Sequence, residues 1–521
     1  MNTPAAALVA RGRLLRGVAA SYGQSIAAML LALITTPIYL HLLGSELFGL
    51  WLVTYSVVGT LGISGLGLPQ AAAVRLTQMV STGELNKGAR LLVTSAWLTS
   101  GFGLLVGSAA ALAIHAGWLG EGLFRGSPSV QDAAIPVLMI VGGAYLIGLP
   151  FEQCRGVLRA FQRVDIEQMV VTLSRLGSML SGVAVLSMGG SIISLALSQA
   201  VVSLVVSFAW AVGAAYCFRG IRLNLLQCDT QLVRELISPS LHFLVLSVAG
   251  ALMWSADNVV LASVVGAGAV ASYGVGNRLL SMGFTMMSVG LNAIGPALTA
   301  IWASRDQKRL QQAFLNSLRI YSVATALLAV EFAFHGRSFI RLWAGQNIVP
   351  VLPVFALLLG LFVVRSIAAA FELLVVSSAQ HQKYSYLMSI QGIVNLALSI
   401  LLTQRFGVVG LASAMLISMV IGIGWYLPWK SCRIAQVSAP LVLRHVFLPA
   451  LLPLCAGSAA SLLLAAVPGQ GWTAWVFRST VCAAAFLWTY HLRGMSDWDR
   501  QVLARLLDRL RAAIAATNRR A

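Results

Sequence analysis

Charged residues are scarce in this chain of 521 residues: they make up 10%, while 58% of the residues are hydrophobic and the mean hydropathy is +0.85. A soluble domain carries about 25% charged residues, so this chain lacks the polar surface that would cover it in water. The length alone would allow about three soluble domains, but no stretch of even ~40 residues has a soluble composition. The scarcity of charge therefore excludes a soluble globular protein and indicates one membrane-embedded unit.

The sequence also lacks the alternation of apolar and polar residues, over about ten positions, that is typical of transmembrane β-strands. Its apolar blocks are long and continuous, and helices are the remaining structure that satisfies backbone groups in lipid. We predict an all-α integral membrane protein with about 14 transmembrane helices. Their expected bounds, with an uncertainty of about 4 residues, are 17–40, 46–67, 91–117, 133–150, 166–187, 191–217, 240–264, 268–302, 320–335, 349–378, 386–403, 408–427, 446–467 and 471–491.

Acidic residues are few: 16 Asp and Glu stand against 35 Lys and Arg, for a net charge of +19. In a soluble protein this excess would suggest nucleic acid, but here the basic residues gather in alternate connections. If the N-terminus lies inside, the inner segments hold 27 of them and the outer loops hold 4. Such a bias follows the positive-inside rule, so we expect both termini in the cytoplasm, no signal peptide and no nucleic-acid partner. The tail 492–521 has helical spacing of apolar residues and is expected to be an amphipathic helix on the inner surface.

Catalytic and metal-binding motifs are absent. The sequence contains no Ser/His/Asp set, no HExxH and no GxxxxGK[ST], so we expect neither an enzyme nor a nucleotide-driven pump. The outer loops are short, the longest being about Trp118–Asp132, which argues against a membrane glycan polymerase or ligase. No cysteine pair has metal-ligand spacing and none lies in an expected outer loop, so free thiols are expected, with no metal or cofactor. The cysteines are Cys154, Cys217, Cys228, Cys432, Cys455 and Cys482.

A faint internal repeat suggests how the helices are grouped. The first and seventh expected helices both end in a glycine turn, at Gly44 and Gly266, and an aromatic-Gly pair follows each turn. Parallel repeats are a common plan among transporters. We predict two pseudo-symmetric six-helix lobes with two C-terminal helices appended. The expected parts are 1–217 for the N-terminal lobe, 218–239 for a cytoplasmic linker, 240–427 for the C-terminal lobe, 428–491 for helices 13–14 and 492–521 for the tail.

Four segments resemble a known family. They are 37–49 (PIYLHLLGSELFG), 62–71 (GISGLGLPQA), 254–278 with its ending ASYGVGNR, and 339–345 (FIRLWAG). Together with the helix count, they resemble polysaccharide flippases of the Wzx type, in the multidrug/oligosaccharidyl-lipid/polysaccharide exporter (MOP) superfamily. The resemblance covers most of the chain, and it includes Asn277 in the third segment.

The resemblance implies a transporter that works by alternating access between two lobes. Its substrate would be an oligosaccharide on an undecaprenyl-pyrophosphate anchor, flipped across the bacterial inner membrane for O-antigen, capsule or exopolysaccharide synthesis. The expected partners are this lipid-linked oligosaccharide, membrane lipids and the polysaccharide polymerase and chain-length machinery. A peptidoglycan-precursor flippase and an ion-coupled multidrug exporter of the same superfamily remain alternatives. The exporter is the weaker one, since the expected helices 1–6 have no acid in their interiors.

Ionisable residues inside the expected spans are the candidates for a binding site, because each costs a few kcal/mol in lipid and normally faces a cavity or a partner. A diphosphate carries about two negative charges, and the planar fork of arginine offers it paired donors. We expect three arginines to line a cavity for this head group, with Gln24, Gln199, Gln391 and Asn395 available to the glycan. The candidates are Arg175, Arg278, Arg365, Asp257, Glu372 and Asn277.

Each candidate also has a structural interpretation. Asp257 and Arg278 lie at similar depths on either side of one turn, so an ion pair across this hairpin is an alternative. Arg365 and Glu372 are seven residues apart and share a helix face, so they too are candidates for mutual neutralisation. Arg175 has no acid within one turn and is the most suggestive. Glu331, near the outer end of its span, is expected to reach toward the surface.

A further cationic group follows the fourth expected helix. Arg155, Arg159 and Arg163 are spaced four residues apart, and on a continuing helix they would form one stripe at the cytoplasmic mouth. Such a stripe would capture a diphosphate there. Ordinary positive-inside anchoring explains the same residues.

Overall fold

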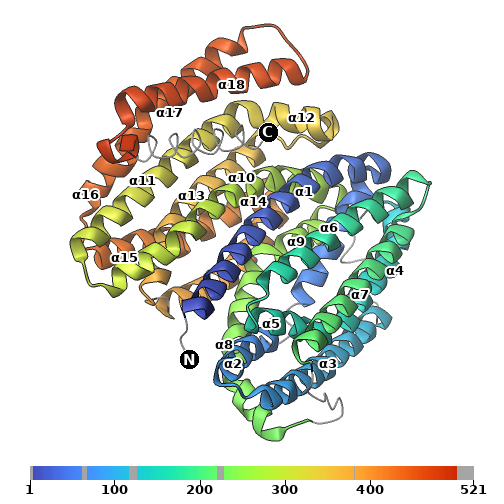
Figure 1. Ribbon diagram of the computed structural model, residues 1–521. Coiled ribbons are helices and arrows are strands. Elements are labelled where there is room, and N and C mark those ends of the chain that lie inside the picture. Colours follow the sequence, from blue (N-terminus) through green and yellow to red (C-terminus); the bar gives the residue numbers. More distant parts are fainter. Residues whose placement is uncertain (1–3, 62–66, 117–125, 220–227, 381, 502–521) are drawn as a thin grey trace, which may run out of the picture. The chain divides into compact units, whose positions relative to one another are not determined.

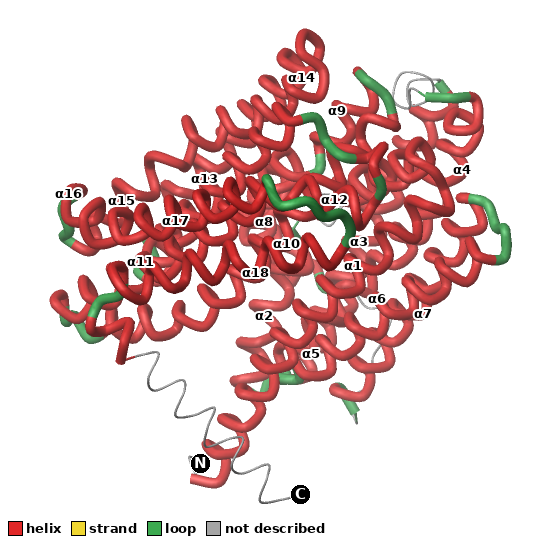
Figure 2. The backbone as a smooth tube through the Cα atoms, turned by 90° about the horizontal axis from the view of Figure 1, so that it is seen from above, coloured by secondary structure: helices red, strands yellow, loops and turns green. Residues whose placement is uncertain are grey.

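The computed structural model describes residues 4–61, 67–116, 126–219, 228–380 and 382–501 (Figure 1). Within these ranges the chain consists of helices joined by short loops, and it contains no strand (Figure 2). The predicted all-α class is therefore confirmed. Most of the expected tail 492–521 lies outside the described residues, so its amphipathic helix stays a prediction.

The helices follow one another closely along the chain. Short π-helical segments adjoin the ends of four helices, at Phe332–Gly336, Val420–Gly424, Leu443–Phe447 and Tyr490–Gly494. The α-helices are α1 Pro4–Leu61, α2 Leu68–Thr82, α3 Leu85–His115, α4 Pro128–Gly148, α5 Glu152–Ala160, α6 Val164–Ser187, α7 Ile192–Cys217, α8 Thr230–Trp254, α9 Ala256–Val264, α10 Ala267–Ala303, α11 Gln307–Glu331, α12 Arg337–Ala344, α13 Leu352–Ser377, α14 Gln382–Met419, α15 Trp425–Ala435, α16 Ala439–Val442, α17 Leu448–Ala465 and α18 Trp472–Thr489.

Among the described residues, nine helical segments are long and apolar enough to cross a membrane, or ten if one bent pair counts as a span. Two of the nine are much longer than the ~20 residues that a crossing needs: Ala20–Thr60 has 41 residues and Gln382–Ala435 has 54. Each contains a non-helical glycine, Gly44 at φ 76° and Gly407 at φ 58°, a conformation that favours glycine. Each of the fourteen predicted spans is mostly helix where the structure describes it, with turns or loop residues at several ends, as at 349–351, and a turn at Ser255 within 240–264. The count itself stays a prediction.

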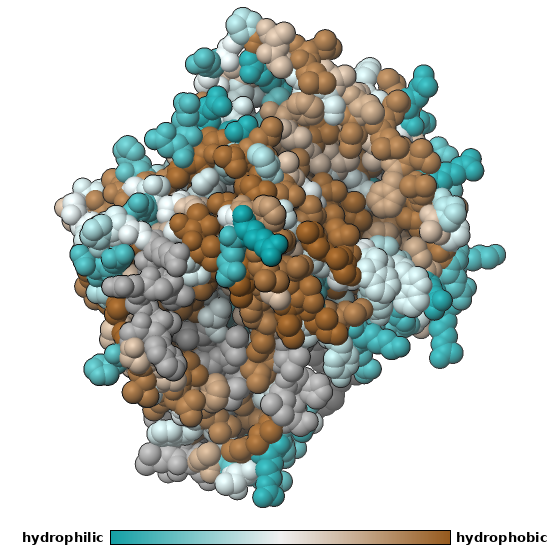
Figure 3. All heavy atoms as spheres, turned by 180° about the vertical axis from the view of Figure 1, so that it is seen from behind, coloured by the Kyte–Doolittle hydropathy of each residue, from teal (hydrophilic) through white to brown (hydrophobic). Residues whose placement is uncertain are grey.

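Apolar side chains cover much of the outside of these helices. Figure 3 shows hydrophobic residues spread over broad areas of the face in view. On α6 and α7, for example, Leu173, Leu180, Val205 and Phe208 are each more than half exposed. Exposed apolar areas of this extent mark a surface that contacts something other than water. Together with the helix lengths, they show a multi-pass membrane protein.

The chain forms two compact units. The first comprises Met1–Arg278, Trp343–Leu357 and Ser385–Gly422, and the second comprises Leu279–Leu342, Leu358–Tyr384 and Ile423–Ala521. These are groupings by proximity, and the predicted pseudo-symmetric lobes remain a prediction.

Close helix packing holds the first unit together around α1. The helix α1 lies along α6 and contacts α4 and α9, while α4 lies along α7. Two glycines permit this approach: a Cβ at Gly49 would collide with the backbone of Ala267, and one at Gly182 would collide with the hydroxyl of Tyr39. Tyr39 donates that hydroxyl to the Ser178 carbonyl of α6 at 3.2 Å. The face of α6 that carries Gly182 is therefore the one turned toward α1.

Candidate functional site

Arg175 lies on α6 and remains exposed although it is turned away from the apolar surface. Successive helical residues are about 100° apart, so Arg175 lies about 20° from the buried Gly182 and about 140–160° from the exposed Leu173 and Leu180. Within the described part of the chain, its guanidinium has no ion-pair or hydrogen-bond partner. An accessible cation on the inward side of a membrane helix can receive an anion from outside the protein.

Asp257 is a deeply buried acid of the first unit, with 3% of its surface exposed. It lies on α9, and its carboxylate accepts hydrogen bonds from Asn395 Nδ2 and Ser399 Oγ of α14, each at 3.4 Å. Ser418 Oγ in turn donates to Asn395 Oδ1 at 2.9 Å. All these partners are neutral. A buried carboxylate in such a site requires a proton or a small cation for its charge to be balanced.

The ion pair considered between Asp257 and Arg278 is not formed. Arg278 lies on α10, is half-buried, and has no ion-pair or hydrogen-bond partner among the described residues. The two residues were matched in depth along the hairpin, but depth does not determine the side of the helix to which a residue points. Asp257 points toward α14 instead. Asn277, the residue before Arg278, is also half-buried and has no hydrogen bond within the described chain.

Arg365 and Glu372 each have a partner in the second unit. The Arg365 guanidinium of α13 lies 3.9 Å from the centroid of the Phe284 ring of α10, a cation–π contact. Glu372 accepts a hydrogen bond from the Tyr384 hydroxyl at 2.8 Å. This arrangement places an aromatic ring and a cation side by side inside the unit. A role for either residue in binding substrate stays a prediction.

The three arginines predicted to form one stripe are divided by a turn. The helix α5 ends at Ala160, so Arg163 does not continue the row but precedes α6 and pairs with Asp165 at 3.6 Å. The single stripe was therefore wrong, because the helix on which it depended stops before its third member. The other two arginines, Arg155 and Arg159, lie on α5.

Arg155 and Arg159 converge on Glu167, which is fully buried. Arg159 holds this carboxylate through two parallel bonds, Nε to Oε2 at 2.8 Å and Nη2 to Oε1 at 2.6 Å, and Arg155 Nη2 adds a third at 3.1 Å. Arg155 also bonds Glu152 at 3.1 Å. The group joins α5 to α6, and its charges are balanced by protein acids. Capture of a diphosphate by these arginines stays a prediction. It is less favoured because protein acids already neutralise their charge.

Several polar residues make contacts that no sequence pattern predicts. Gln199, proposed for the glycan, donates to the Ser178 carbonyl at 2.9 Å and so connects α7 to α6. The Ser399 and Ser418 partners of the Asp257 site come from α14, about 140–160 residues later in the chain, a distance that no local pattern bridges. A second group, Glu331, His335 and Cys482, gathers in the second unit. Its one sequence signal is the Glu331–His335 spacing of four residues.

The fold is that of MOP-superfamily transporters. The chain superposes on a structure of the lipid II flippase MurJ in an inward closed conformation with a TM-score of 0.70 at 14% identity, covering 94% of this chain and 99% of that one. An inward-facing multidrug resistance MATE family transporter of the MOP superfamily gives 0.60 at 13% identity, covering 80% and 96%. A mutant of the Vibrio cholerae MATE transporter VcmN gives 0.56 at 15% identity, covering 84% and 99%.

The sequence itself identifies the family. Residues 14–302, more than half of the chain, match the family model described as "Polysaccharide biosynthesis protein", so the chain belongs to this family. No curated protein sequence matches it. The resemblance found in the four short segments is thereby confirmed at the level of the family, and the fold is the one seen in MOP-superfamily structures.

Proposed function

We propose that this protein flips undecaprenyl-pyrophosphate-linked oligosaccharide from the inner to the outer leaflet of the bacterial inner membrane. The product would serve the synthesis of O-antigen, capsule or exopolysaccharide. The family and the fold support a membrane transporter in polysaccharide biosynthesis. The observation that carries the choice of substrate is Arg175: an arginine that is accessible on the inward side of α6 and lacks a protein counter-charge within the described residues.

The electrostatics favour an anionic lipid head. An uncompensated arginine at membrane depth costs a few kcal/mol, and a diphosphate removes that cost by accepting paired hydrogen bonds from the guanidinium. Arg278 offers a second cation in the same unit, again without a partner in the described chain. The described acids of the first unit that pair with arginines have partners other than Arg175 and Arg278; these acids are Glu152, Asp165, Glu167, Asp229 and Glu235. This distribution of charge suits an anion better than a cationic drug.

Asp257 supplies a candidate for coupling transport to an ion gradient. Its carboxylate has only neutral hydrogen-bond donors around it, so binding and release of a proton or a small cation would change the charge inside the unit by one. The helices α9 and α14 both contribute to the site, and their relative position would respond to that change. The protein would then change between inward-open and outward-open states as Asp257 binds and releases the proton or cation.

A peptidoglycan-precursor flippase is the second candidate, favoured by the likeness to MurJ over 94% of the chain. Its lipid substrate shares the polyprenyl diphosphate anchor, so Arg175 would serve either one. The two functions differ in the glycan alone. We propose that the protein lies in the bacterial inner membrane with both termini in the cytoplasm. Its partners would be the polymerase and chain-length machinery, which receive the flipped substrate.

Reconstitution tests the proposal directly. Purified protein in liposomes receives a short-glycan undecaprenyl diphosphate labelled on the sugar, and a membrane-impermeant glycan-modifying enzyme reports transfer between leaflets. We expect protein-dependent exposure of this substrate, and much less exposure of lipid II or of a cationic dye. Faster movement of lipid II would assign the peptidoglycan role instead. Movement of the dye alone would overturn the flippase proposal.

A further inference from the structure

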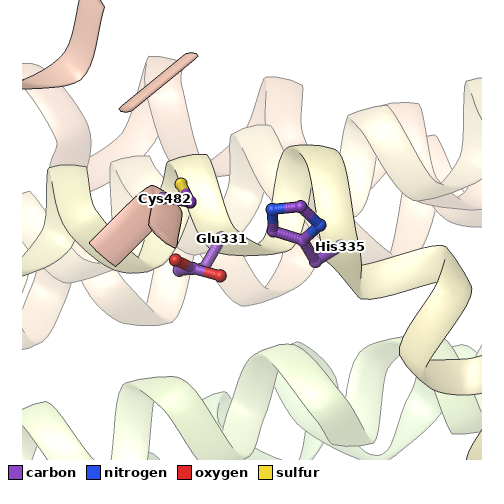
Figure 4. A group of neighbouring side chains, drawn as sticks. All are labelled: Glu331, His335 and Cys482. Atoms are coloured by element: carbon purple, nitrogen blue, oxygen red, sulfur yellow. The ribbon is translucent and has the colours of Figure 1, made fainter. Parts of the chain in front are cut away.

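Three side chains with metal-binding atoms meet in the second unit. Glu331 ends α11, His335 lies in the π-helical segment Phe332–Gly336, and Cys482 lies on α18. One ligand atom from each lies within 4.8 Å of the other two, and Figure 4 shows the three side chains as close neighbours. The imidazole and the thiol are buried. The cluster joins helices about 150 residues apart in sequence.

The neighbours of this cluster orient it and leave one acceptor free. Ser479 Oγ donates to Glu331 Oε2 at 2.6 Å, and Ser461 Oγ lies 3.3 Å from His335 Nε2. The other carboxylate oxygen, Glu331 Oε1, is buried and has no hydrogen-bond partner. A buried carboxylate oxygen without a donor costs free energy, and a cation would satisfy it. Hydrogen bonds from serines to the ligating groups resemble the outer shell of a metal site, which fixes the ligands in place.

We propose that Glu331, His335 and Cys482 bind a divalent transition metal, of which Zn²⁺ is the best fit. A thiolate, an imidazole and a carboxylate together are a donor set for zinc rather than for magnesium or calcium, which prefer oxygen alone. Zinc with ligands at about 2.0–2.3 Å places them roughly 3.3–3.8 Å apart in a tetrahedron. The ligand atoms, which lie within 4.8 Å of one another, would therefore move together by at most about 1–1.5 Å on binding, which side-chain rotation and the irregular π turn allow.

A cavity beside His335 would admit water as a fourth ligand and would give the metal an entry path. A cavity of about 270 Å³ is lined by His335, Ser461 and Trp475 together with the loop 469–471 that precedes α18. Its volume holds several waters, one of which would complete the tetrahedron. The metal would join α18 to α11 by coordination as well as by packing. The absence of metal-ligand spacing between cysteines does not bear on a site that uses a single cysteine.

Cobalt titration of the purified full-length protein tests the site. Co²⁺ replaces Zn²⁺ at such sites, and a thiolate ligand gives an ultraviolet charge-transfer band that oxygen and nitrogen ligands do not give. We expect the band to saturate at one Co²⁺ per chain and to disappear when Zn²⁺ is added. Because the unmodified protein is measured, the result does not depend on how a variant folds. Saturating Co²⁺ without a thiolate band would overturn the proposal.

Matched variants assign the ligands. Cys482→Ser and His335→Gln should each weaken Zn²⁺ binding at least tenfold, and Cys482→Ser should abolish the band. Cys455→Ser, which changes an exposed cysteine on the neighbouring helix α17, should leave both unchanged. Equal Zn²⁺ affinity in Cys482→Ser and Cys455→Ser would place the metal elsewhere. Elemental analysis of protein purified without added metal, before and after chelation, gives the native occupancy independently of transport.

Discussion

Arg175 and Arg159 are close in sequence but have opposite environments, and this difference makes their roles separable. Arg159 is bonded through two parallel contacts to a buried carboxylate, while Arg175 has no such partner in the described chain. A cation held by protein contributes to folding. A cation without a protein partner stabilises the complex with an anionic ligand and contributes little to folding. Substitution of each should therefore affect different measurements.

For Arg175 we expect loss of transport with normal folding. Arg175→Gln should insert and purify like the parent but lose most flipping of the diphosphate-linked glycan, because the charge that meets the head group is gone. Arg175→Lys should retain part of it, since the charge stays while the bidentate fork is lost, and Arg175→Glu should be inactive. The proteoliposome assay at matched protein amounts measures this. Near-normal flipping by Arg175→Gln would return Arg175 to helix packing.

For Arg159 we expect loss of stability with little loss of transport. Arg159→Gln removes two charge-assisted bonds from the fully buried Glu167 and leaves Arg155 as its remaining partner. The variant should lose about 1–3 kcal/mol of stability and keep its flipping rate per folded molecule. Thermal unfolding in detergent, followed by fluorescence, measures the first effect. A fully stable variant with impaired flipping would instead support diphosphate capture at this group.

The buried carboxylate of Asp257 leads to a third prediction. Because Asp257 bonds to Asn395 and Ser399 rather than to Arg278, removing both charges should not restore what either single change removes. We expect Asp257→Asn to abolish the dependence of flipping on an ion gradient, Arg278→Gln to weaken substrate binding, and the double variant to show both defects. A double variant milder than each single one would reveal an ion pair in the working protein.

At the scale of elements, one buried acid, Asp499, connects the segment after α18 to α11. Asp499 is buried, and its Oδ2 accepts hydrogen bonds from Ser496 N at 2.8 Å and from the Tyr490 hydroxyl at 3.1 Å. The same oxygen lies 3.2 Å from Arg319 Nε of α11, which is itself 12% exposed. One carboxylate thus caps a turn and neutralises a buried arginine. It connects the end of the chain to the helix that also carries Glu331.

Asp499→Ala should destabilise the second unit by about 3–5 kcal/mol, because it leaves the Arg319 charge buried without its partner. The control is Asp497→Ala, two residues earlier, where the side chain is exposed and the expected effect is within about 0.5 kcal/mol. Thermal unfolding of both purified variants in the same detergent gives the comparison. If the two variants melt together, the ion pair contributes nothing measurable to the fold.

The sequence predicts those features of the helices that depend on local composition, and it does not predict those that depend on contacts between distant segments. Lipid demands long apolar helices, so hydropathy located the described helices, and positive φ at Gly44 and Gly407 accounts for turns that separate adjacent spans. The side of the helix to which Asp257 points was not predictable, because it is set by contacts with α14 far along the chain. The arginine stripe depended on a helix that continues past Ala160, and the turn at Gln162, with φ 56°, ends that helix before Arg163.

At the scale of the whole molecule, the family and the fold followed from motifs and helix order, whereas the grouping into units did not. Residues 343–357 and 385–422 group by proximity with the N-terminal part of the chain, while the two six-helix lobes suggested by the repeat stay a prediction. Proximity depends on which helices contact one another, and hydropathy contains no such information. The orientation in the membrane is a different case, because it depends on the basic residues in the segments that connect the helices, and the sequence shows these directly.

The orientation is therefore the prediction that tests the whole layout at once. With both termini inside, the inner connections hold 27 basic residues and the outer ones 4, and translocation of so many inner charges would be strongly opposed. Reporter fusions after Gly220 and Arg433 should be active in the cytoplasm, and fusions near Ser127 and Gly345 in the periplasm. A reporter that works only in the cytoplasm and a second that works only outside give each site its own control. Because the helices alternate, a single miscounted span would invert every later site, so an opposite result at any one of the four would break the fourteen-helix arrangement.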